Sequence, residues 1–128
     1  MKANTRLLYL GMLYDYGDPQ RGLSFEERNF YAPIRRMCDR NEWEISRFDF
    51  MDLGRKHGRE RMSEMLWETV KRDRPQYLVS ILFDPQHDPL NETLRRISFE
   101  TCRSRNQPIS CGVCSATPRR WKRHVANE

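Results

Sequence analysis

Three short apolar runs divide the chain, and polar or turn-forming residues bound each of them. The runs cover residues 6–13, 43–50 and 77–83, and the first and third are nearly continuous. Each is far shorter than the roughly 20 apolar residues that cross a bilayer. Runs of this length are typical of strands buried on both faces, as in a parallel sheet. The pattern therefore predicts three central strands.

The first helix is predicted to begin at Ser24. Ser24 and Glu27 have the spacing of a capping box, in which each side chain satisfies the other residue's free backbone amide. Pro33 lies inside the helical pattern, and because it lacks an amide hydrogen we expect it to kink the helix or split it near Ala32. The apolar face of this helix is predicted to consist of Phe30, Ile34, Met37 and Cys38.

Two further helices are predicted downstream. Residues 59–72 repeat apolar side chains at helical spacing, whereas residues 52–58 are predicted to be a loop. Asp88 is expected to cap the third helix, with Pro89 at its first position, where proline is favoured. The apolar face of the third helix is predicted to consist of Leu90, Leu94 and Ile97.

Strand and helix alternate three times in this pattern. Such alternation predicts an α/β, Rossmann-like three-layer sandwich, with a short parallel sheet and helices on both faces. A fourth strand at residues 108–114 is a weak prediction because Pro108 and Gly112 interrupt it. We expect residues 1–98 to form the domain and residues 99–128 to be a basic tail that contains cysteines.

The charge is concentrated in that tail. Residues 1–100 carry no net charge, so the formal net charge of +5 comes from residues 101–128. A neutral body argues against nucleic acid as its partner. The basic run at residues 119–123 leaves one alternative open, in which the tail binds a nucleic acid or an acidic partner.

The cysteine content and the amino terminus suggest a reducing environment. Four cysteines in 128 residues are too sparse for a disulfide scaffold. No secretory signal is visible, so we expect a cytoplasmic protein with no membrane partner. Cys111 and Cys114 form a CxxC pair that Cys102 and His124 would extend to four zinc ligands. Their spacing matches no common zinc module, so no metal is expected.

Candidate site residues lie where the predicted strands end, because ligands of open parallel sheets bind beyond those ends. The loop after the first strand supplies Asp15, Tyr16, Gly17, Arg21 and Ser24 as candidate substrate-binding residues. This loop leads into a helix whose free amides favour an anion. The structural alternative is that Asp and Gly only shape the loop and that Ser24 is only a cap.

Asp84 and His87 follow the third strand and are the candidate catalytic residues. A histidine there is suited to act as a general base on a hydroxyl, because its pKa lies near neutrality. The alternative is an ordinary solvated loop histidine. The glycines are wrongly spaced for a dinucleotide fingerprint, and no P-loop motif occurs, so no cofactor is expected.

Two parts of the chain carry a resemblance to a known family. Residues 7–26 and 29–31 resemble the amino end of spore-maturation (CgeB-type) glycosyltransferase-like proteins, and residues 48–51, 74–77 and 82–84 fit later strands of that pattern. The resemblance implies a two-Rossmann-domain (GT-B-like) glycosyltransferase. Its amino-terminal domain binds the sugar acceptor, and its carboxy-terminal domain binds the nucleotide sugar. It further implies Asp84 or His87 as the base that activates the acceptor hydroxyl, without a metal.

The chain departs from this family near residue 98, where a fourth strand and then the donor domain should follow. A truncation, a frameshift or a partner that supplies the second half would each explain the departure. We therefore expect the chain alone to transfer no sugar, and to bind nucleotide sugar only with a second domain. A non-catalytic ligand- or partner-binding module is the alternative function. A short sheet would also leave an open edge beside the first strand, which invites self-association.

Overall fold

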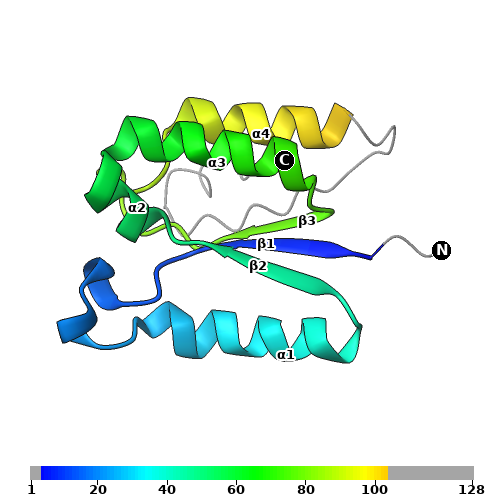
Figure 1. Cartoon of the computed structure of the whole chain (residues 1–128), viewed down its shortest axis with the longest axis horizontal. Helices are drawn as coiled ribbons and strands as arrows, with labels where there is room; N and C mark the ends of the chain where they lie inside the picture. Colours follow the sequence, from blue (N-terminus) through cyan, green and yellow to red (C-terminus); the bar gives the residue numbers. More distant parts are fainter. Residues whose placement is uncertain (1–3, 104–128) are drawn as a thin grey trace, which may run out of the picture.

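The computed structural model describes residues 4–103, which fold into a three-stranded parallel sheet with helices on both faces (Figure 1). The strands are β1 (Arg6–Leu10), β2 (Glu44–Phe48) and β3 (Tyr77–Ser80). They confirm the predicted α/β, Rossmann-like class and the three parallel strands. Each strand is shorter than its apolar run, because the chain leaves the sheet before the run ends.

The strand order is β2-β1-β3, so β1 is the central strand. Leu8 of β1 lies opposite Ser46 of β2 and Leu78 of β3. The prediction of an open edge beside the first strand is therefore wrong, because the connection between β2 and β3 carries the chain across β1. Within residues 4–103 the outer strands are β2 and β3, and the doubtful strand at residues 108–114 lies outside the described residues.

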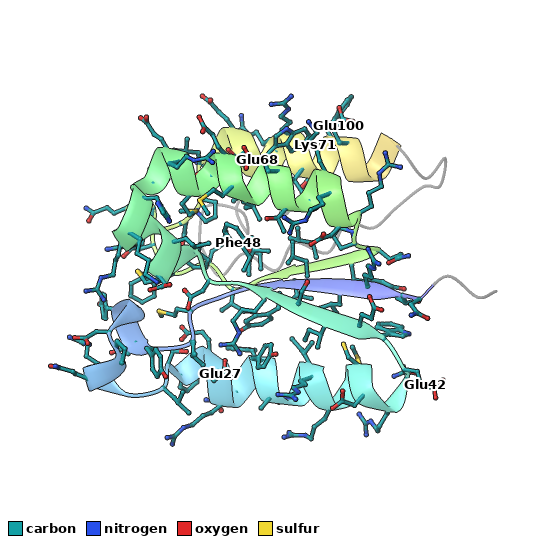
Figure 2. The ribbon with its side chains drawn as sticks, viewed as in Figure 1. Glu27, Glu42, Phe48, Glu68, Lys71 and Glu100 are labelled. Carbon is teal, nitrogen blue, oxygen red and sulfur yellow. The ribbon has the colours of Figure 1, made fainter. Side chains whose placement is uncertain are left out.

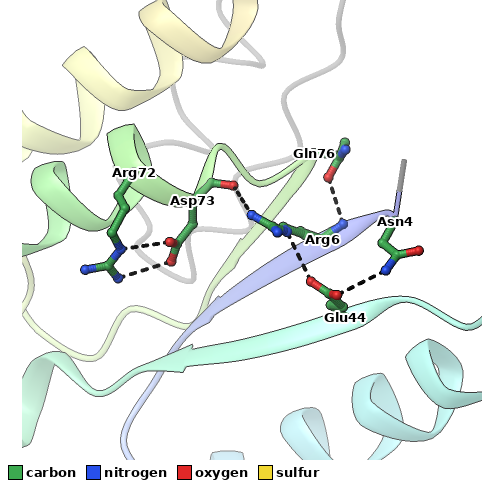
Figure 3. Close-up of polar contacts among 6 residues, drawn as sticks. All are labelled: Asn4, Arg6, Glu44, Arg72, Asp73 and Gln76. Atoms are coloured by element: carbon green, nitrogen blue, oxygen red, sulfur yellow. Dashed lines mark hydrogen bonds and ion pairs between the residues drawn. The ribbon is translucent and has the colours of Figure 1, made fainter. Parts of the chain in front are cut away.

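Arg6 ties the amino ends of the three strands together (Figure 3). Its guanidinium pairs with Glu44 on β2, at 3.1 Å, and donates to the backbone oxygen of Asp73, at 3.2 Å. Its backbone amide donates to the side chain of Gln76, at 2.7 Å. These contacts fix the register of β1 against both neighbours.

One face of the sheet is covered by a π-helical turn (η3, Glu27–Tyr31) that continues into α1 (Ala32–Arg40). Pro33 has no amide hydrogen to donate. Beside it the helix changes from a π-helical turn to an α-helix, and the amide of Ala32 donates to the carbonyl of Glu27, five residues earlier. The helix is therefore not split near Ala32: the disruption expected there takes the form of a π-helical turn that continues directly into α1. Phe30 leaves the predicted apolar face, and Tyr31 packs against Tyr9 in its place.

Only half of the predicted capping box forms. The backbone amide of Glu27 donates to the Ser24 hydroxyl, at 3.1 Å. The Glu27 carboxylate turns away and pairs with Arg47 on β2, at 2.6 Å. The backbone amide of Ser24 donates instead to the carbonyl of Leu13, so it does not need the carboxylate.

The other face is covered by α2 (Phe50–His57), α3 (Arg59–Asp73) and α4 (Asn91–Arg103). Residues 52–57 belong to α2 and only Gly58 is non-helical, so the predicted loop over residues 52–58 is wrong. Phe48 points into the larger core, between the sheet and α3 (Figure 2). This core consists of Leu8, Leu10, Met12, Phe48, Phe50, Met51, Met62, Leu66, Val70 and Ile97.

The start of α4 differs from the prediction. The helix begins at Asn91, and the carboxylate of Asp88 accepts hydrogen bonds from the loop before it rather than capping the helix. The helix runs on to Arg103, so the domain boundary expected at residue 98 falls inside it; the rest of the predicted tail lies outside the described residues. Among residues 4–103, no helix has the length and apolar character needed to cross a membrane.

Candidate ligand site at the carboxyl edge of the sheet

The loops that follow β1 and β3 meet at one end of the sheet. The chain leaves β1 toward α1 on one face and leaves β3 toward α4 on the other (Figure 1). The strand order therefore reverses between β1 and β3, and such a switch point is where open α/β sheets bind ligands.

The loop after β1 contains two short 3₁₀ turns, η1 (Asp15–Gly17) and η2 (Pro19–Arg21). Tyr16 has a φ of 52°, in the left-handed region that non-glycine residues seldom adopt. Its backbone oxygen accepts a hydrogen bond from Arg55 on α2, at 3.2 Å. Gly17, with a φ of 70°, fits the same turn, and a Cβ there would lie 3.2 Å from the Arg55 side chain.

Arg21 closes the loop back onto its first turn. Its Nε pairs with the Asp15 carboxylate, at 3.1 Å, and its guanidinium carbon lies 4.6 Å from the centre of the Tyr16 ring. Asp15, Tyr16, Gly17 and Arg21 thus form one cluster. Both charges remain partly exposed and keep hydrogen-bonding capacity for a ligand.

Ser24 lies behind this cluster. It is fully buried, and its hydroxyl donates to the carbonyl of Met12, at 2.7 Å, while accepting from Glu27. The hydroxyl is therefore already hydrogen-bonded within the fold. Its observed role is to anchor the loop and cap the helical segment that follows.

The loop after β3 is organised by Asp84 and Asp88. The Asp84 carboxylate accepts backbone hydrogen bonds from Gln86 and His87, and both of its oxygens lie 2.8 Å from Nδ1 of His87. A carboxylate only accepts, so Nδ1 carries a proton in this pair, and in the neutral imidazole Nε2 is the nitrogen with the lone pair. Burial acts to raise the pKa of Asp84, but these hydrogen bonds outweigh it and hold the pKa below the ordinary range.

The two loops touch through aromatic rings. The Tyr16 ring centre lies 5.1 Å from that of Phe83 and 6.3 Å from that of His87, with the rings edge to face. Tyr16 is therefore the predicted first-loop residue that contacts the Asp84–His87 pair, through the His87 ring. Asp15 and Arg21 are linked to that contact through Tyr16, and Ser24 lies behind the loop.

Three supporting residues were not predicted for this site. Asp88 is only 6% exposed, and its carboxylate accepts from the amides of Phe83, at 2.6 Å, and Asp84, at 3.1 Å. Arg59 of α3 donates to the Asp88 carbonyl, at 2.7 Å, as Arg55 of α2 does to Tyr16. The spacing of Asp84 and Asp88, four residues apart, could have indicated Asp88. The contacts of Arg55 and Arg59 depend on where α2 and α3 lie, which the sequence pattern does not give.

The predicted cysteine and histidine cluster and the basic run are features of the tail rather than of these two loops. In the part of the chain that the structure describes, no three His, Cys, Asp or Glu side chains gather as a metal site. The side chains of Cys102, Cys111, Cys114 and His124 lie outside the described part, as does the basic run at residues 119–123.

Comparison with protein families, curated proteins and solved structures finds no significant match to the chain. The glycosyltransferase resemblance therefore stays a prediction, and any function has to be argued from the site itself.

Proposed function

We propose that the chain is the acceptor-side domain of a glycosyltransferase, and that the meeting of the β1 and β3 loops is its acceptor site. The observation that carries the proposal is the Asp84–His87 pair, placed at the switch point of the sheet and against Tyr16. Two further features support it. Asp15 and Arg21 offer a carboxylate and a guanidinium to sugar hydroxyls, and the exposed Tyr16 ring offers an apolar surface to a sugar ring.

In the proposed reaction, His87 is the general base. Nε2 accepts the proton of the acceptor hydroxyl as that oxygen bonds to the anomeric carbon, and the bond from that carbon to the nucleotide diphosphate breaks. Asp84 is a positioning residue, since it holds the imidazole through Nδ1 and stabilises the imidazolium that forms. The nucleotide sugar has to come from a second, donor-binding domain, so this chain alone is expected to bind an acceptor without transferring a sugar.

The proposal is tested by titrating the isotope-labelled full chain with monosaccharides and with a nucleotide sugar, while recording amide chemical shifts. We expect monosaccharide-dependent shifts confined to residues 14–21 and 83–88. His87→Ala should weaken binding about tenfold, the effect of losing one hydrogen bond. His57→Ala, at the exposed end of α2, is the matched control and should change nothing. Absence of these shifts with every sugar overturns the acceptor site, and turnover by the pure chain overturns its dependence on a second domain.

A non-catalytic ligand- or partner-binding module is the second candidate. The observation that favours it is that the Asp84 carboxylate is engaged within its own loop, by the amides of Gln86 and His87 as well as the imidazole. On this alternative the pair only shapes the loop. His87→Ala would then leave ligand affinity unchanged, which is opposite to the result expected for an acceptor site.

A further inference from the structure

The outer edge of β3 has no strand beside it in the described part of the chain. Within residues 4–103 β3 pairs only with β1, and a strand paired on one side offers its remaining backbone amides and carbonyls to a further strand. Its side chains on the α1 face of the sheet are also incompletely covered, since Tyr77 is 49% exposed and Val79 and Ile81 are half-buried. This edge is therefore a docking surface for an extended segment.

The handedness of the chain determines on which side of the sheet a fourth strand belongs. α3 lies on one face and carries the chain from β2, past β1, to β3. α4 lies on that same face, where its Ile97 joins the same core as Leu66 of α3 (Figure 1). Connections between parallel strands are right-handed in about 98% of cases. A second right-handed connection over the same face continues in the same direction, so it ends at the outer edge of β3 and not beside β2.

The end of α4 lies within reach of that edge. The helix ends at Arg103, above the end of the sheet where the strands begin (Figure 1). The next stretch of alternating apolar and small residues is at 108–114. Residues 104–107 would connect it to α4, and this length lies within the about 2–6 residues usual between a helix and the following strand. The segment that the topology calls for is therefore the one that follows.

The residues of this stretch match the two faces of β3. Ile109, Cys111 and Val113 share one face of an extended chain, and they would extend the half-exposed row on the α1 face of the sheet. Ser110 would lie on the other face, where β3 presents Ser80. The Ser80 hydroxyl is fully buried and has no hydrogen-bond partner among the described residues, so its surroundings are incomplete there.

We propose that residues 108–114 of this chain dock on the outer edge of β3 as a fourth parallel strand. Pro108 fits because proline is accepted at the first residue of a strand, and Gly112 weakens the strand without removing a hydrogen bond. A parallel strand at this place ends at the carboxyl edge of the sheet. The basic run at residues 119–123 would then follow it on the side of the loop after β3. The proposal does not depend on the sugar acceptor site.

The first test observes the pairing directly, by NMR of the isotope-labelled full chain. We expect nuclear Overhauser contacts between backbone protons of residues 77–81 and 108–114, advancing in the same direction along both segments. Their absence, when contacts between β1 and β3 are present, overturns the proposal. A mixture of differently labelled chains tests the alternative occupant. Contacts that arise between two copies assign the edge to a second copy and overturn docking within the chain.

The second test uses proline substitutions and amide hydrogen exchange. Ser110→Pro/Val113→Pro removes one amide from each side of the proposed strand, so one of them belongs to the pairing with β3. The β3 amides that face away from β1 should be protected in the parent chain and exchange at least about tenfold faster in this variant. Lys122→Pro/Val125→Pro, with the same spacing, is the matched control and should change nothing. Equal exchange in the parent and both variants overturns the proposal, and if the first variant fails to fold, the Overhauser contacts of the parent chain decide.

Discussion

Gly11 and Tyr9 show how closely the backbone is packed where β1 ends. A Cβ at Gly11 would lie 2.5 Å from Cε1 of Tyr9, whose ring is fully buried against Tyr31. Gly11→Ala must therefore displace the ring, and we expect it to lower the free energy of unfolding by about 1–3 kcal/mol. Urea unfolding measures this change.

Gly54→Ala is the control for that substitution. Gly54 lies within α2, and a Cβ there would meet only the Met62 side chain, at an ordinary 3.7 Å. Alanine favours a helix, so this variant should be more stable by up to about 1 kcal/mol. If both alanine variants moved stability in the same direction, the close approach at Gly11 would not be the cause.

Asp88 should make stability depend on pH. Its burial raises the pKa of the carboxyl, more than the backbone hydrogen bonds from Phe83 and Asp84 lower it. A raised pKa in the folded state means stability that is full at acidic pH and is lost as the pH rises through that pKa. Asp88→Asn keeps an oxygen acceptor without the charge, so it should gain stability relative to the parent as the pH rises above about 4.

Unfolding midpoints between acidic and neutral pH check this prediction. If the difference in midpoint between Asp88→Asn and the parent chain stayed constant with pH, the prediction would be contradicted. Asp84→Asn is the contrasting variant, because hydrogen bonds hold the pKa of Asp84 below its ordinary range despite the opposing effect of burial. As the pH falls below about 4, the parent chain should therefore lose stability relative to the Asp84→Asn variant.

At the scale of whole elements, α2 depends on one aspartate. Asp49 caps the helix by accepting from the amide of Asp52, at 3.0 Å, and its second oxygen accepts from the amide of Leu13, at 3.0 Å. Asp49→Ala removes both acceptors and should cost about 2 kcal/mol, whereas Asp49→Asn keeps one acceptor and should cost about half as much. Equal losses in urea unfolding would contradict the double role.

Asp52→Ala is the control at this helix. Asp52 pairs with Lys56 on the exposed surface, at 2.9 Å, and such pairs contribute less than about 1 kcal/mol. The loss should therefore be smaller than in either Asp49 variant.

The same helix shows where sequence patterns stop being informative. Phe50 extends the apolar run of the second strand, yet it is the first residue of α2, and its side chain is buried in the core. Both a strand and a helix would bury Phe50, so hydrophobicity cannot distinguish the two. Two other features of the sequence indicate a helix: Asp49, whose side chain caps it by accepting from the amide of Asp52, and Gly58, which ends it with a φ of 86°.

Only part of the candidate site could be predicted from the sequence, because some of its residues follow strands and others reach it from distant helices. Parallel strands end at one edge, so Asp15, Tyr16, Asp84 and His87 could be placed there from chain order alone. Arg55 could not, because its contact with Tyr16 requires α2 to lie beside the first loop. Residues next to strand ends were thus predictable, and residues that reach the site across the fold were not.

At the scale of the whole molecule, β1 should be the most protected part. It is paired on both sides, and Leu7, Leu8, Tyr9 and Leu10 are all buried. Its amides should exchange with solvent more slowly than those of the outer strand β2, whose residues are mostly exposed or half-buried. Hydrogen exchange followed by NMR measures this, and equal rates in the two strands would contradict the prediction.

The central position of β1 also determines when a nascent chain can fold. β1 is synthesised first, but Leu7 pairs with Ile45 on one side and with Tyr77 on the other. The sheet cannot close until the last of these has left the ribosome, and contacts so distant in sequence form slowly. Until then the most apolar strand lacks its β3 neighbour, and before β2 emerges it lacks both, which makes this interval the one in which a chaperone would matter most.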